Sequence, residues 1–594
     1  MAVALLPAQG LEYVRAHYTK YEYRIPMRDG KRLFTAVYVP KDTSQSYPIM
    51  LTRTPYSVAP YGSDNYKTDL GPSEKFGREG FIFAYQDVRG RLMSEGDFVD
   101  MRPYIPDKQG TQVDESSDTY DTIDWLVKHV PHNNGRVGVY GISYPGFYSA
   151  MASIDAHPAL KAVSPQAPIA DWFVGDDFHH NGAVFLAHAF GFFSGFGWPR
   201  PEPTTEAGRR FDFGTPDGYD FYLRMGTVSG AEQYLHNQVA FWEDLIAHPN
   251  YDDFWKARNI LPHLKNIKPA MLTVGGWFDA EDLYGALNVF KTVEKQGGAP
   301  ANTLVMGPWF HGGWSRSTGA SLGEVQFNSN TSEFYRENIE FPFFMYYLKD
   351  KGDGRMPKAY LFETGLNQWR KLDAWPPKDA KPEALYLHAG GKLSFDPPED
   401  AAGYDEYISD PNRPVPYMGT IVMGMAREYM VADQRFAAQR PDVLVYATEP
   451  LDHDVTIAGP VTPSLFVSTS GTDSDFVVKL IDVYPNDATP GGYEQLVRGE
   501  PFRGRFRNGY DKPEAFVPNQ TVKLEYVMPD IYHTFRRGHR IMVQVQSSWF
   551  PLTDRNPQKF VDIYKARPED FQKATERVFH SKQFPSAVKV GLIQ

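Results

Sequence analysis

The sequence predicts an α/β fold that is interrupted by a helical segment and followed by an all-β domain. Short apolar runs alternate with helical ones up to about residue 166, which is typical of a mostly parallel sheet covered by helices. This alternation stops between residues 171 and 262, where aromatic residues crowd together. After the proline-rich "DAWPPKDAKPE" (residues 373–383), short β-type runs separated by turn residues favour a β-sandwich or jelly roll.

The first elements of the α/β part follow one another closely. Buried strands are expected in "YPIMLTRTPY" (residues 47–56) and "GFIFAYQDVRG" (residues 80–90). In "DTYDTIDWLVKHV" (residues 118–130), apolar residues recur at helical spacing after an acidic first turn, as in an amphipathic helix. A turn and a strand follow in "NGRVGVYGIS" (residues 134–143), and "LKAVSPQAP" (residues 160–168) is the next strand.

Residues 171–262 are expected to form a helical cap inserted into this domain. They include "FLAHAFGFFSGFGWPRPEP" and lack a strand pattern. Strands resume in "AMLTVGGWFD" (residues 270–279) and "NTLVMGPWFH" (residues 302–311), so the flanking parts belong to one α/β domain. The predicted units are 1–170 and 263–372 for the α/β domain, 171–262 for the cap and 373–594 for the β-rich domain.

Composition restricts the partners of the chain. With 594 residues, of which 42% are apolar and 15% aromatic, it can form sizeable cores. The formal net charge of -12 argues against nucleic acid, whose binding needs clustered positive charge. The absence of cysteine rules out disulfides, zinc-thiolate sites and a cysteine nucleophile. No apolar run approaches the roughly 18 to 20 residues that cross a bilayer, so we expect no membrane partner.

The stretch "VGVYGISYPGFYSA" (residues 137–150) places Ser143 on a glycine-rich turn between a strand and a helix. An α/β hydrolase has its nucleophile on such a turn, where Gly141 and Gly146 would leave room for the sharp bend. The pattern is Gly-x-Ser-x-x-Gly, because Pro145 stands in place of the usual glycine. A small residue that only serves the turn is the structural alternative.

A serine nucleophile needs a base, and the base needs a carboxylate that orients it. In this architecture both follow later strands, in the chain order serine, acid, histidine. Asp279 closes one predicted strand and His311 closes the next. Single histidines and strand-end aspartates are usually structural, but here the order and the positions both fit. We therefore predict Ser143 as nucleophile, His311 as base and Asp279 as acid.

Acyl transfer also needs hydrogen-bond donors for the tetrahedral oxyanion. The backbone N–H of Tyr144, directly after the nucleophile, is the expected first donor. Tyr56 ends the early strand "LTRTPY", and its phenol is the candidate second donor. An ordinary packed aromatic residue is the alternative for this tyrosine.

Further acidic residues lie close to these positions in the sequence. Glu281 and Asp282 follow the predicted acid in "GGWFDAEDLYG", and the cap contains "VGDDFHHNG" with Asp176, Asp177, His179 and His180. Several carboxylates together favour a cation that they surround, so the cluster could bind a substrate ammonium. Aspartate and histidine could instead hold a divalent metal ion. Helix capping and solvated charge are the structural alternative.

Long motifs indicate a family. The stretches "RTPY", "QDVRGRLMSEGDF", "YGISYPGFYSA", "SPQAPIADWFVGDDFHHNG", "GGWFDAEDLYGA" and "GPWFHGGW" closely resemble the α-amino acid ester hydrolases. Their wider group includes cocaine esterase, glutaryl-cephalosporin acylase and the X-Pro dipeptidyl peptidases. The C-terminal "REYMVADQRFAAQRPDVLVYATEPL" and "HRIMVQVQSSWFP" are similar too, so the resemblance covers essentially the whole chain.

This resemblance implies an α/β-hydrolase domain with an inserted helical cap and a C-terminal jelly roll. It implies the roles already predicted for Ser143, Asp279 and His311, and an oxyanion hole formed by the Tyr56 hydroxyl and the Tyr144 N–H. It also implies that a carboxylate cluster recognises the α-ammonium of the substrate. The matching positions of that cluster are Asp177, Glu281 and Asp282.

The implied enzyme cleaves amino acid esters through an aminoacyl-enzyme, which passes to water or to an amine such as an amino acid, a peptide or a β-lactam nucleus. No cofactor and no metal are expected. The alternatives are an X-Pro dipeptidyl peptidase or glutaryl acylase, a sugar-binding protein with an inactive hydrolase half, and a metalloenzyme built on "DDFHH". We expect a homo-oligomer, in the periplasm or secreted if a signal peptide was removed; a cytoplasmic location stays open.

Overall fold

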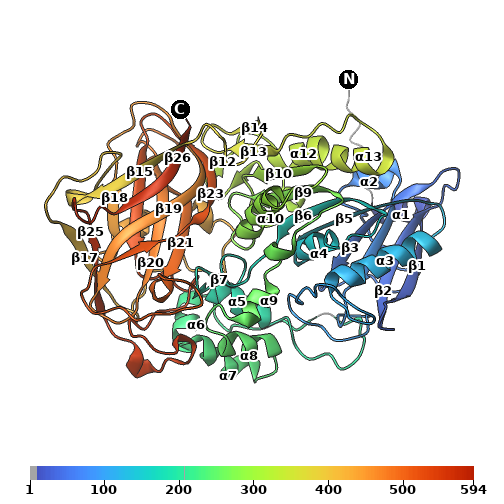
Figure 1. The fold of residues 1–594 in the computed structure, drawn as a ribbon, viewed down its shortest axis with the longest axis horizontal. Helices are drawn as coiled ribbons and strands as arrows, with labels where there is room; N and C mark the ends of the chain where they lie inside the picture. The colour runs from blue at the N-terminus through green and yellow to red at the C-terminus, as the bar shows by residue number, and fades with distance from the viewer. Residues whose placement is uncertain (1–9, 207, 594) are drawn as a thin grey trace.

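The computed structural model describes residues 10–206 and 208–593, and a ten-stranded sheet forms the framework of its first part (Figure 1). The strands from β4 to β13 run parallel, and those at both edges pair antiparallel, which confirms the predicted α/β domain. In spatial order the strands are β1 (Tyr18–Pro26), β2 (Arg32–Pro40), β4 (Ile82–Asp87), β3 (Tyr47–Thr54), β5 (Asn133–Ser143), β6 (Leu160–Pro168), β9 (Ala270–Gly276), β10 (Asn302–Gly307), β13 (Ala359–Glu363) and β14 (Gln368–Leu372).

Helices cover both faces of this sheet (Figure 1). On one face, α3 and α4 share an apolar core in which Leu126 and Phe147 are buried; on the other, α13 buries Phe344 with Met50 of the sheet. Helix α3 begins three residues earlier than predicted, because Asp114 caps it by accepting a hydrogen bond from the Ser117 N–H. The helices of this domain are α1 (Gly10–His17), α2 (Glu74–Glu79), α3 (Glu115–His129), α4 (Tyr144–Ala152), α10 (Leu283–Lys295), α11 (Gly313–Arg316), α12 (Thr331–Tyr335) with a π-helical turn (Arg336–Glu340), and α13 (Phe341–Lys349).

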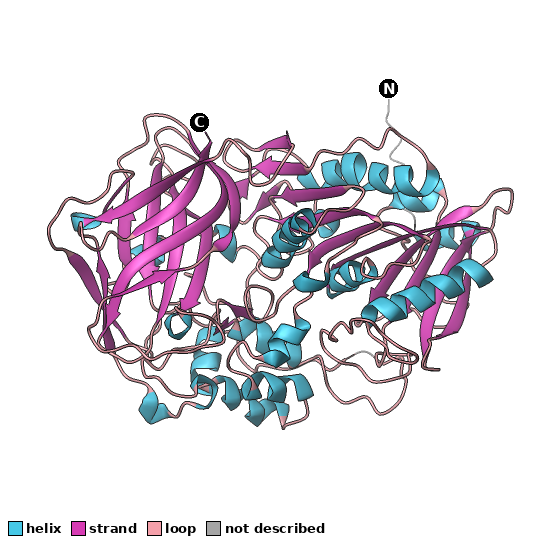
Figure 2. Cartoon of the chain, viewed as in Figure 1, coloured by secondary structure: helices cyan, strands magenta, loops and turns pink. Residues whose placement is uncertain are grey.

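The cap is a group of short helices below the sheet in the view of Figure 2. It also contains a small hairpin of two-residue strands, which the sequence patterning did not predict because strands this short carry no periodicity. Its aromatic residues form much of the apolar core that continues into the α/β domain. The cap elements are β7 (His179–His180), β8 (Ala183–Val184), α5 (Leu186–Phe193), α6 (Gly218–Met225), α7 (Glu232–Leu235), α8 (Ala240–Ala247) and α9 (Asp253–Arg258).

The C-terminal domain is all-β apart from short helical turns, as predicted, and has its own apolar core. Its sheet has twelve strands, with long β19 pairing to four neighbours. The strands are β15 (Lys381–His388), β16 (Lys392–Ser394), β17 (Tyr404–Ser409), β18 (Leu444–Ala447), β19 (Val455–Thr469), β20 (Asp475–Val483), β21 (Glu494–Arg503), β22 (Val522–Glu525), β23 (Met528–Phe535), β24 (Arg540–Gln546), β25 (Ala574–Phe579) and β26 (Ala587–Ile593), with helix α14 (Arg435–Ala438). A separate hairpin, which precedes this domain in the chain, pairs β11 (Ser321–Leu322) with β12 (Val325–Gln326).

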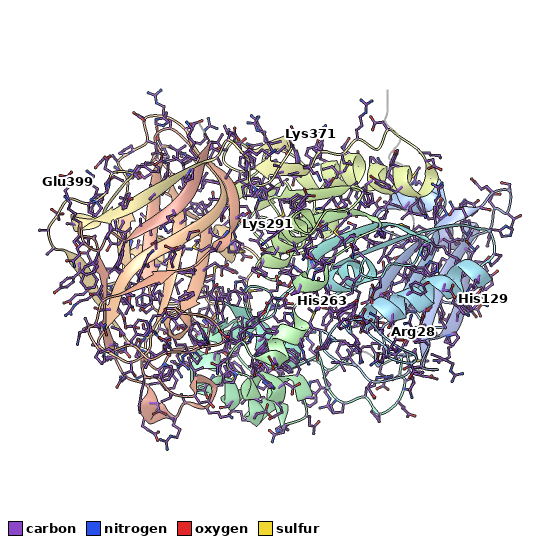
Figure 3. The ribbon with its side chains drawn as sticks, viewed as in Figure 1. Arg28, His129, His263, Lys291, Lys371 and Glu399 are labelled. Carbon is purple, nitrogen blue, oxygen red and sulfur yellow. The ribbon has the colours of Figure 1, made fainter. Side chains whose placement is uncertain are left out.

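Polar contacts join the C-terminal domain to the α/β domain beside the candidate site. Lys291 of α10, labelled in Figure 3, lies 2.7 Å from Asp530 of β23. Arg498 of β21 is buried and donates a hydrogen bond of 2.8 Å to the Trp277 carbonyl oxygen, directly after β9. The all-β domain thus supports the loop that carries the predicted catalytic acid.

In the part of the chain that the structure describes, the helices are all too short or too polar to cross a bilayer.

Candidate active site

Ser143 ends β5 and is followed at once by α4, on a turn with little free space. Its φ of 70° and ψ of −128° are unusual for a residue with a side chain. A Cβ atom on Gly141 would lie 2.4 Å from Cβ of Pro145, and one on Gly146 would lie 2.4 Å from the Gln166 carbonyl oxygen. Both positions therefore require glycine, and the strained turn presents the half-buried serine at the carboxyl end of the sheet.

Asp279 and His311 meet beyond the ends of β9 and β10. Nδ1 of His311 lies 3.0 Å and 3.1 Å from the two carboxylate oxygens of Asp279, and since a carboxylate only accepts, the ring N–H donates. The strands were predicted to reach both residues, but they end at Gly276 and Gly307. A Cβ on Gly276 would lie 2.2 Å from the Trp309 carbonyl oxygen, and this close approach turns the chain into loops.

The loop after β9 holds Asp279 firmly and brings a second carboxylate to the histidine. One oxygen of Asp279 accepts the backbone N–H groups of Glu281 and Asp282 at 2.9 Å and 3.0 Å. The Glu281 carboxylate lies 3.3 Å from Nε2 of His311. Burial opposes the charged ring, but Asp279 and Glu281 outweigh it and raise the pKa of His311 to about 9.

The two predicted oxyanion donors, Tyr56 and Tyr144, both lie next to Ser143. Tyr56 follows β3, and its hydroxyl has the Ser143 side chain as a hydrogen-bond partner. Although 44% of Tyr56 is exposed, desolvation by the surrounding protein and the nearby carboxylates raise its pKa, so the phenol keeps the proton that it would donate. Tyr144 is the first residue of α4, where N–H groups have no intrahelical acceptor. Its own hydroxyl is anchored, because it accepts the Met101 N–H at 2.8 Å.

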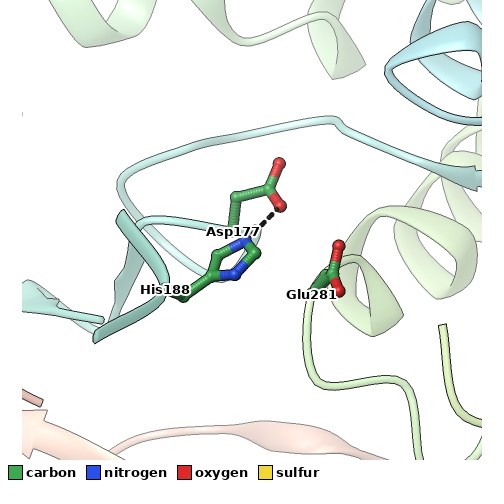
Figure 4. Close-up of side chains that lie close together, drawn as sticks. All are labelled: Asp177, His188 and Glu281. Carbon is green, nitrogen blue, oxygen red and sulfur yellow. Dashed lines mark hydrogen bonds and ion pairs between the residues drawn. The ribbon is translucent and has the colours of Figure 1, made fainter. Parts of the chain in front are cut away.

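Asp177, His188 and Glu281 form a compact group (Figure 4), and Glu281 of this group contacts His311. Asp177 has a left-handed φ of 47°, and its backbone N–H donates to the Glu281 carbonyl oxygen at 2.8 Å, which ties the cap to the loop after β9. One of its carboxylate oxygens accepts from the Trp172 indole at 2.8 Å and the other from Nε2 of His188 at 3.1 Å. Burial raises the pKa of Asp177, but the His188 partner more than offsets this and lowers it.

His188 was missed by the sequence analysis. It comes from α5, whose other residues are apolar, and only the fold brings it to Asp177. Burial lowers the pKa of His188, but the hydrogen bond with Asp177 prevails and raises it. A single titratable side chain in the aromatic run "FLAHAFGFF" was the available signal.

Asp282 and Asp176 are both buried, but they differ in their hydrogen bonds. Asp176 accepts backbone N–H groups from Ala170 and Gly285 at 2.8 Å and 2.7 Å, so it organises the loop. Neither carboxylate oxygen of Asp282 has a hydrogen-bond partner among the described residues. Burial and then the charges of Asp177 and Asp176 raise the pKa of Asp282 well above its ordinary value, which favours the neutral acid.

The histidines of "DDFHH" do not join a metal site. His179 contacts the Trp172 carbonyl oxygen at 2.9 Å and the Tyr564 hydroxyl at 2.9 Å, and His180 lies 2.8 Å from Glu500. The potential ligand atoms of Asp177, His188 and Glu281 lie within 4.8 Å of one another. His179 and His180 lie outside this group, and the His188 nitrogen that faces it lies 3.1 Å from Asp177.

Comparison with known families matches almost the whole chain. Residues 29–313 match the X-Pro dipeptidyl-peptidase (S15 family), and residues 344–589 match the X-Pro dipeptidyl-peptidase C-terminal non-catalytic domain. A cocaine esterase from Rhodococcus sp. (strain MB1 Bresler) is 29% identical, over 96% of this chain and 98% of the relative.

Two solved structures are similar throughout. An aminopeptidase from the marine sediment archaeon Thaumarchaeota archaeon is 40% identical with a TM-score of 0.90, and 97% of each chain is covered. An α-amino acid ester hydrolase is 39% identical with a TM-score of 0.90, again over 97% of each chain. The two relatives differ in the bond that their names say they cleave, but both names refer to substrates with an amino group.

Proposed function

Because the chain belongs to the S15 family of serine hydrolases, we propose that it cleaves α-amino acid esters through an aminoacyl-enzyme on Ser143. The likeness to the α-amino acid ester hydrolase supports this choice within the family. The observation that carries the proposal is the anionic group of Asp177 and Glu281 directly beside His311.

The position of this group favours the α-ammonium of the acyl residue itself. The Glu281 carboxylate is 3.3 Å from Nε2 of His311, the nitrogen that must serve the nucleophile. In an α-amino acid ester only one carbon atom separates the ammonium from the reacting carbonyl. The ammonium can therefore reach Glu281 while the carbonyl lies beside His311. A dipeptidyl substrate would hold its ammonium roughly 3.5 Å farther away, the length of one residue.

In the proposed reaction, Ser143 Oγ attacks the ester carbonyl carbon while its proton passes to Nε2 of His311. The Tyr56 hydroxyl and the Tyr144 N–H donate to the oxyanion. The intermediate collapses, the C–O bond to the alcohol breaks, and His311 returns the proton to the leaving alkoxide. Water then adds to the aminoacyl-enzyme by the same steps and releases the amino acid. Asp279 orients the ring and stabilises the imidazolium.

An amine in place of water would give an amide, so aminoacyl transfer to amino acids, peptides or β-lactam nuclei is the second part of the proposal. An excess of glycinamide added to alanine methyl ester should then yield alanyl-glycinamide, measured by mass spectrometry. Formation of free alanine alone would restrict the enzyme to hydrolysis.

The decisive experiment compares alanine methyl ester with N-acetylalanine methyl ester, which lacks the ammonium but keeps the ester. We expect kcat/KM to be about 10- to 100-fold higher for the free amine, corresponding to the roughly 1.5–3 kcal/mol of a charged hydrogen bond. Equal values would refute ammonium recognition and leave a general esterase.

The aminopeptidase relative makes peptide hydrolysis a second candidate. Alanine p-nitroanilide presents the same acyl group with an amine as leaving group, whereas glycyl-proline p-nitroanilide and glutaryl p-nitroanilide report the X-Pro and glutaryl activities. A higher kcat/KM for alanine p-nitroanilide than for alanine methyl ester would favour the aminopeptidase. Faster cleavage of either other anilide would favour that activity instead.

A further inference from the structure

We propose that Glu281 blocks the catalytic base in the free enzyme and that the ammonium of the substrate releases it. The geometric basis is the contact of 3.3 Å between the Glu281 carboxylate and Nε2 of His311. Through the second step, displacement by an ammonium, this inference rests on the proposed function. It gives Glu281 a role in specificity beyond that of a simple binding group.

The contact occupies the nitrogen that the reaction needs. Nδ1 of His311 donates to Asp279, so the ring can accept a proton only at Nε2. A carboxylate beside Nε2 is stabilising only if this nitrogen carries a proton, and the ring is then an imidazolium that cannot act as a base. Among the described residues no hydrogen bond joins the Ser143 hydroxyl to His311, whereas the Tyr56 hydroxyl interacts with it.

Several carboxylates surround His311, and their contacts indicate which of them is free to move. Asp279, Glu281 and Asp282 face it from the loop after β9, with Asp282 at 3.9 Å, and Asp177 with its partner His188 faces it from the cap. Tyr56 completes the surroundings as a neutral phenol. These groups surround His311 with negative charge, which favours the imidazolium, whereas burial alone would favour the neutral ring.

Glu281 is the least restrained of these carboxylates. Asp279 accepts two backbone N–H groups and Asp177 accepts from Trp172 and His188. In the described part of the chain the Glu281 carboxylate accepts no hydrogen bond from a backbone N–H or from a tryptophan side chain, and 27% of its side chain is exposed. An ammonium between Asp177 and Glu281 offers a better partner than the ring, because three N–H donors replace one.

The consequence is that an ammonium affects the chemical step and not only binding. A substrate with an α-ammonium draws Glu281 away, so Nε2 can lose its proton and turn toward Ser143. A neutral acyl group meets a base that is still occupied. Discrimination should therefore show in kcat as well as in KM.

The test uses a small neutral fluorophosphonate, which needs no ammonium site. It forms a Ser143 Oγ–P bond as the P–F bond breaks, with the serine proton passing to His311 and fluoride leaving. We expect methylammonium chloride to accelerate labelling of the wild-type enzyme at pH 7 by roughly tenfold, a part of the roughly 10²–10⁴-fold that general-base catalysis contributes. Tetramethylammonium chloride at the same ionic strength cannot donate hydrogen bonds and should have no effect. An unchanged or slower rate with methylammonium overturns the proposal.

The Glu281→Gln variant, which removes the blocking carboxylate, provides a second test of the proposal. It should label faster than wild type without any amine, should lose the response to methylammonium, and should show the midpoint of its pH–rate profile shifted downward from about 9. Glu399→Gln, an exposed position of the C-terminal domain labelled in Figure 3, should behave as wild type. Slower labelling of Glu281→Gln, or an unshifted profile, overturns the proposal.

Failure of this inference can be told apart from failure of the proposed function. If alanine methyl ester is strongly preferred but methylammonium does not accelerate labelling, the Glu281 block is wrong and ammonium recognition stands. If methylammonium accelerates labelling but the two esters react equally, the block of His311 by Glu281 stands, whereas its release by the substrate ammonium and the proposed substrate class are both wrong.

Discussion

The candidate site has two halves that are built differently. The reaction half, Ser143, Asp279 and His311, follows strands β5, β9 and β10 of one sheet. The recognition half, Asp177, His188 and Glu281, combines two segments of the cap with the loop after β9. Adjacent parallel strands bring their ends together in any sheet of this kind, whereas the recognition half depends on how the cap packs. Chemistry and specificity can therefore change separately.

Glu281 links the halves, since it contacts His311 and its carbonyl oxygen accepts the Asp177 N–H. Changes confined to the reaction half should affect every ester alike. Changes confined to the recognition half should affect mainly esters that carry an ammonium.

The largest effect is expected for Ser143→Ala. Loss of the nucleophile should reduce kcat by about 10⁶-fold, as for nucleophile deletions in serine hydrolases, equally for alanine methyl ester and for p-nitrophenyl acetate. Ester hydrolysis measured by pH-stat and by absorbance would show this, with circular dichroism as the control for folding. A decrease that is limited to one of the two esters would contradict the division into halves.

The pH dependence of stability should report the charged state of His311. Its pKa is raised from 6.5 to about 9 on folding, so the imidazolium contributes stability that is complete below pH 6.5 and is lost as the pH rises through about 9. This contribution is at most about 3 kcal/mol. The Tm of the wild type should exceed that of His311→Asn at pH 6.5, and the difference should shrink by pH 9.5. A constant difference would show that the ring is neutral in the folded chain.

Asp177→Asn should damage recognition and spare chemistry. Asparagine tolerates the left-handed backbone at this position, so the loop should keep its conformation. We expect kcat/KM for alanine methyl ester to fall about 10- to 100-fold, in line with the roughly 1.5–3 kcal/mol of a charged hydrogen bond. The value for p-nitrophenyl acetate should change much less. Parallel losses for both esters would assign Asp177 to the reaction half.

The smallest expected effects are the changes in stability caused by two glycine-to-alanine substitutions, which should be opposite in sign. In Gly141→Ala the new methyl group would lie 2.4 Å from Pro145, so the turn must shift, at a cost of about 1–3 kcal/mol and with reduced activity on all esters. Gly191→Ala in α5 meets nothing within 4 Å and should raise stability by up to about 1 kcal/mol. Thermal unfolding of both variants measures the contrast. A tolerated Gly141→Ala would mean that the turn has more room than its geometry indicates.

Local sequence was sufficient for the reaction half. Gly141, Pro145 and Gly146 allow one sharp strand-to-helix turn, so the position of Ser143 could be inferred before the fold was known. Asp279 and His311 could be placed because the carboxyl ends of parallel strands meet at one edge. The strand ends themselves were misjudged by three and four residues, since "WFD" (residues 277–279) and "PWFH" (residues 308–311) pack as loops rather than as strands.

Long-range packing decided the rest. The sequence determined the fold class, the turn at Ser143 and the placement of Asp279 and His311 after successive strands, because these depend on periodicity and on contacts between near neighbours. Only the tertiary structure decided that His179 contacts Tyr564 and that His180 contacts Glu500. It also brought His188 to Asp177. It also placed the Glu281 carboxylate beside Nε2 of His311. No local pattern encodes these contacts, since each arises where separate segments bury their polar groups against one another.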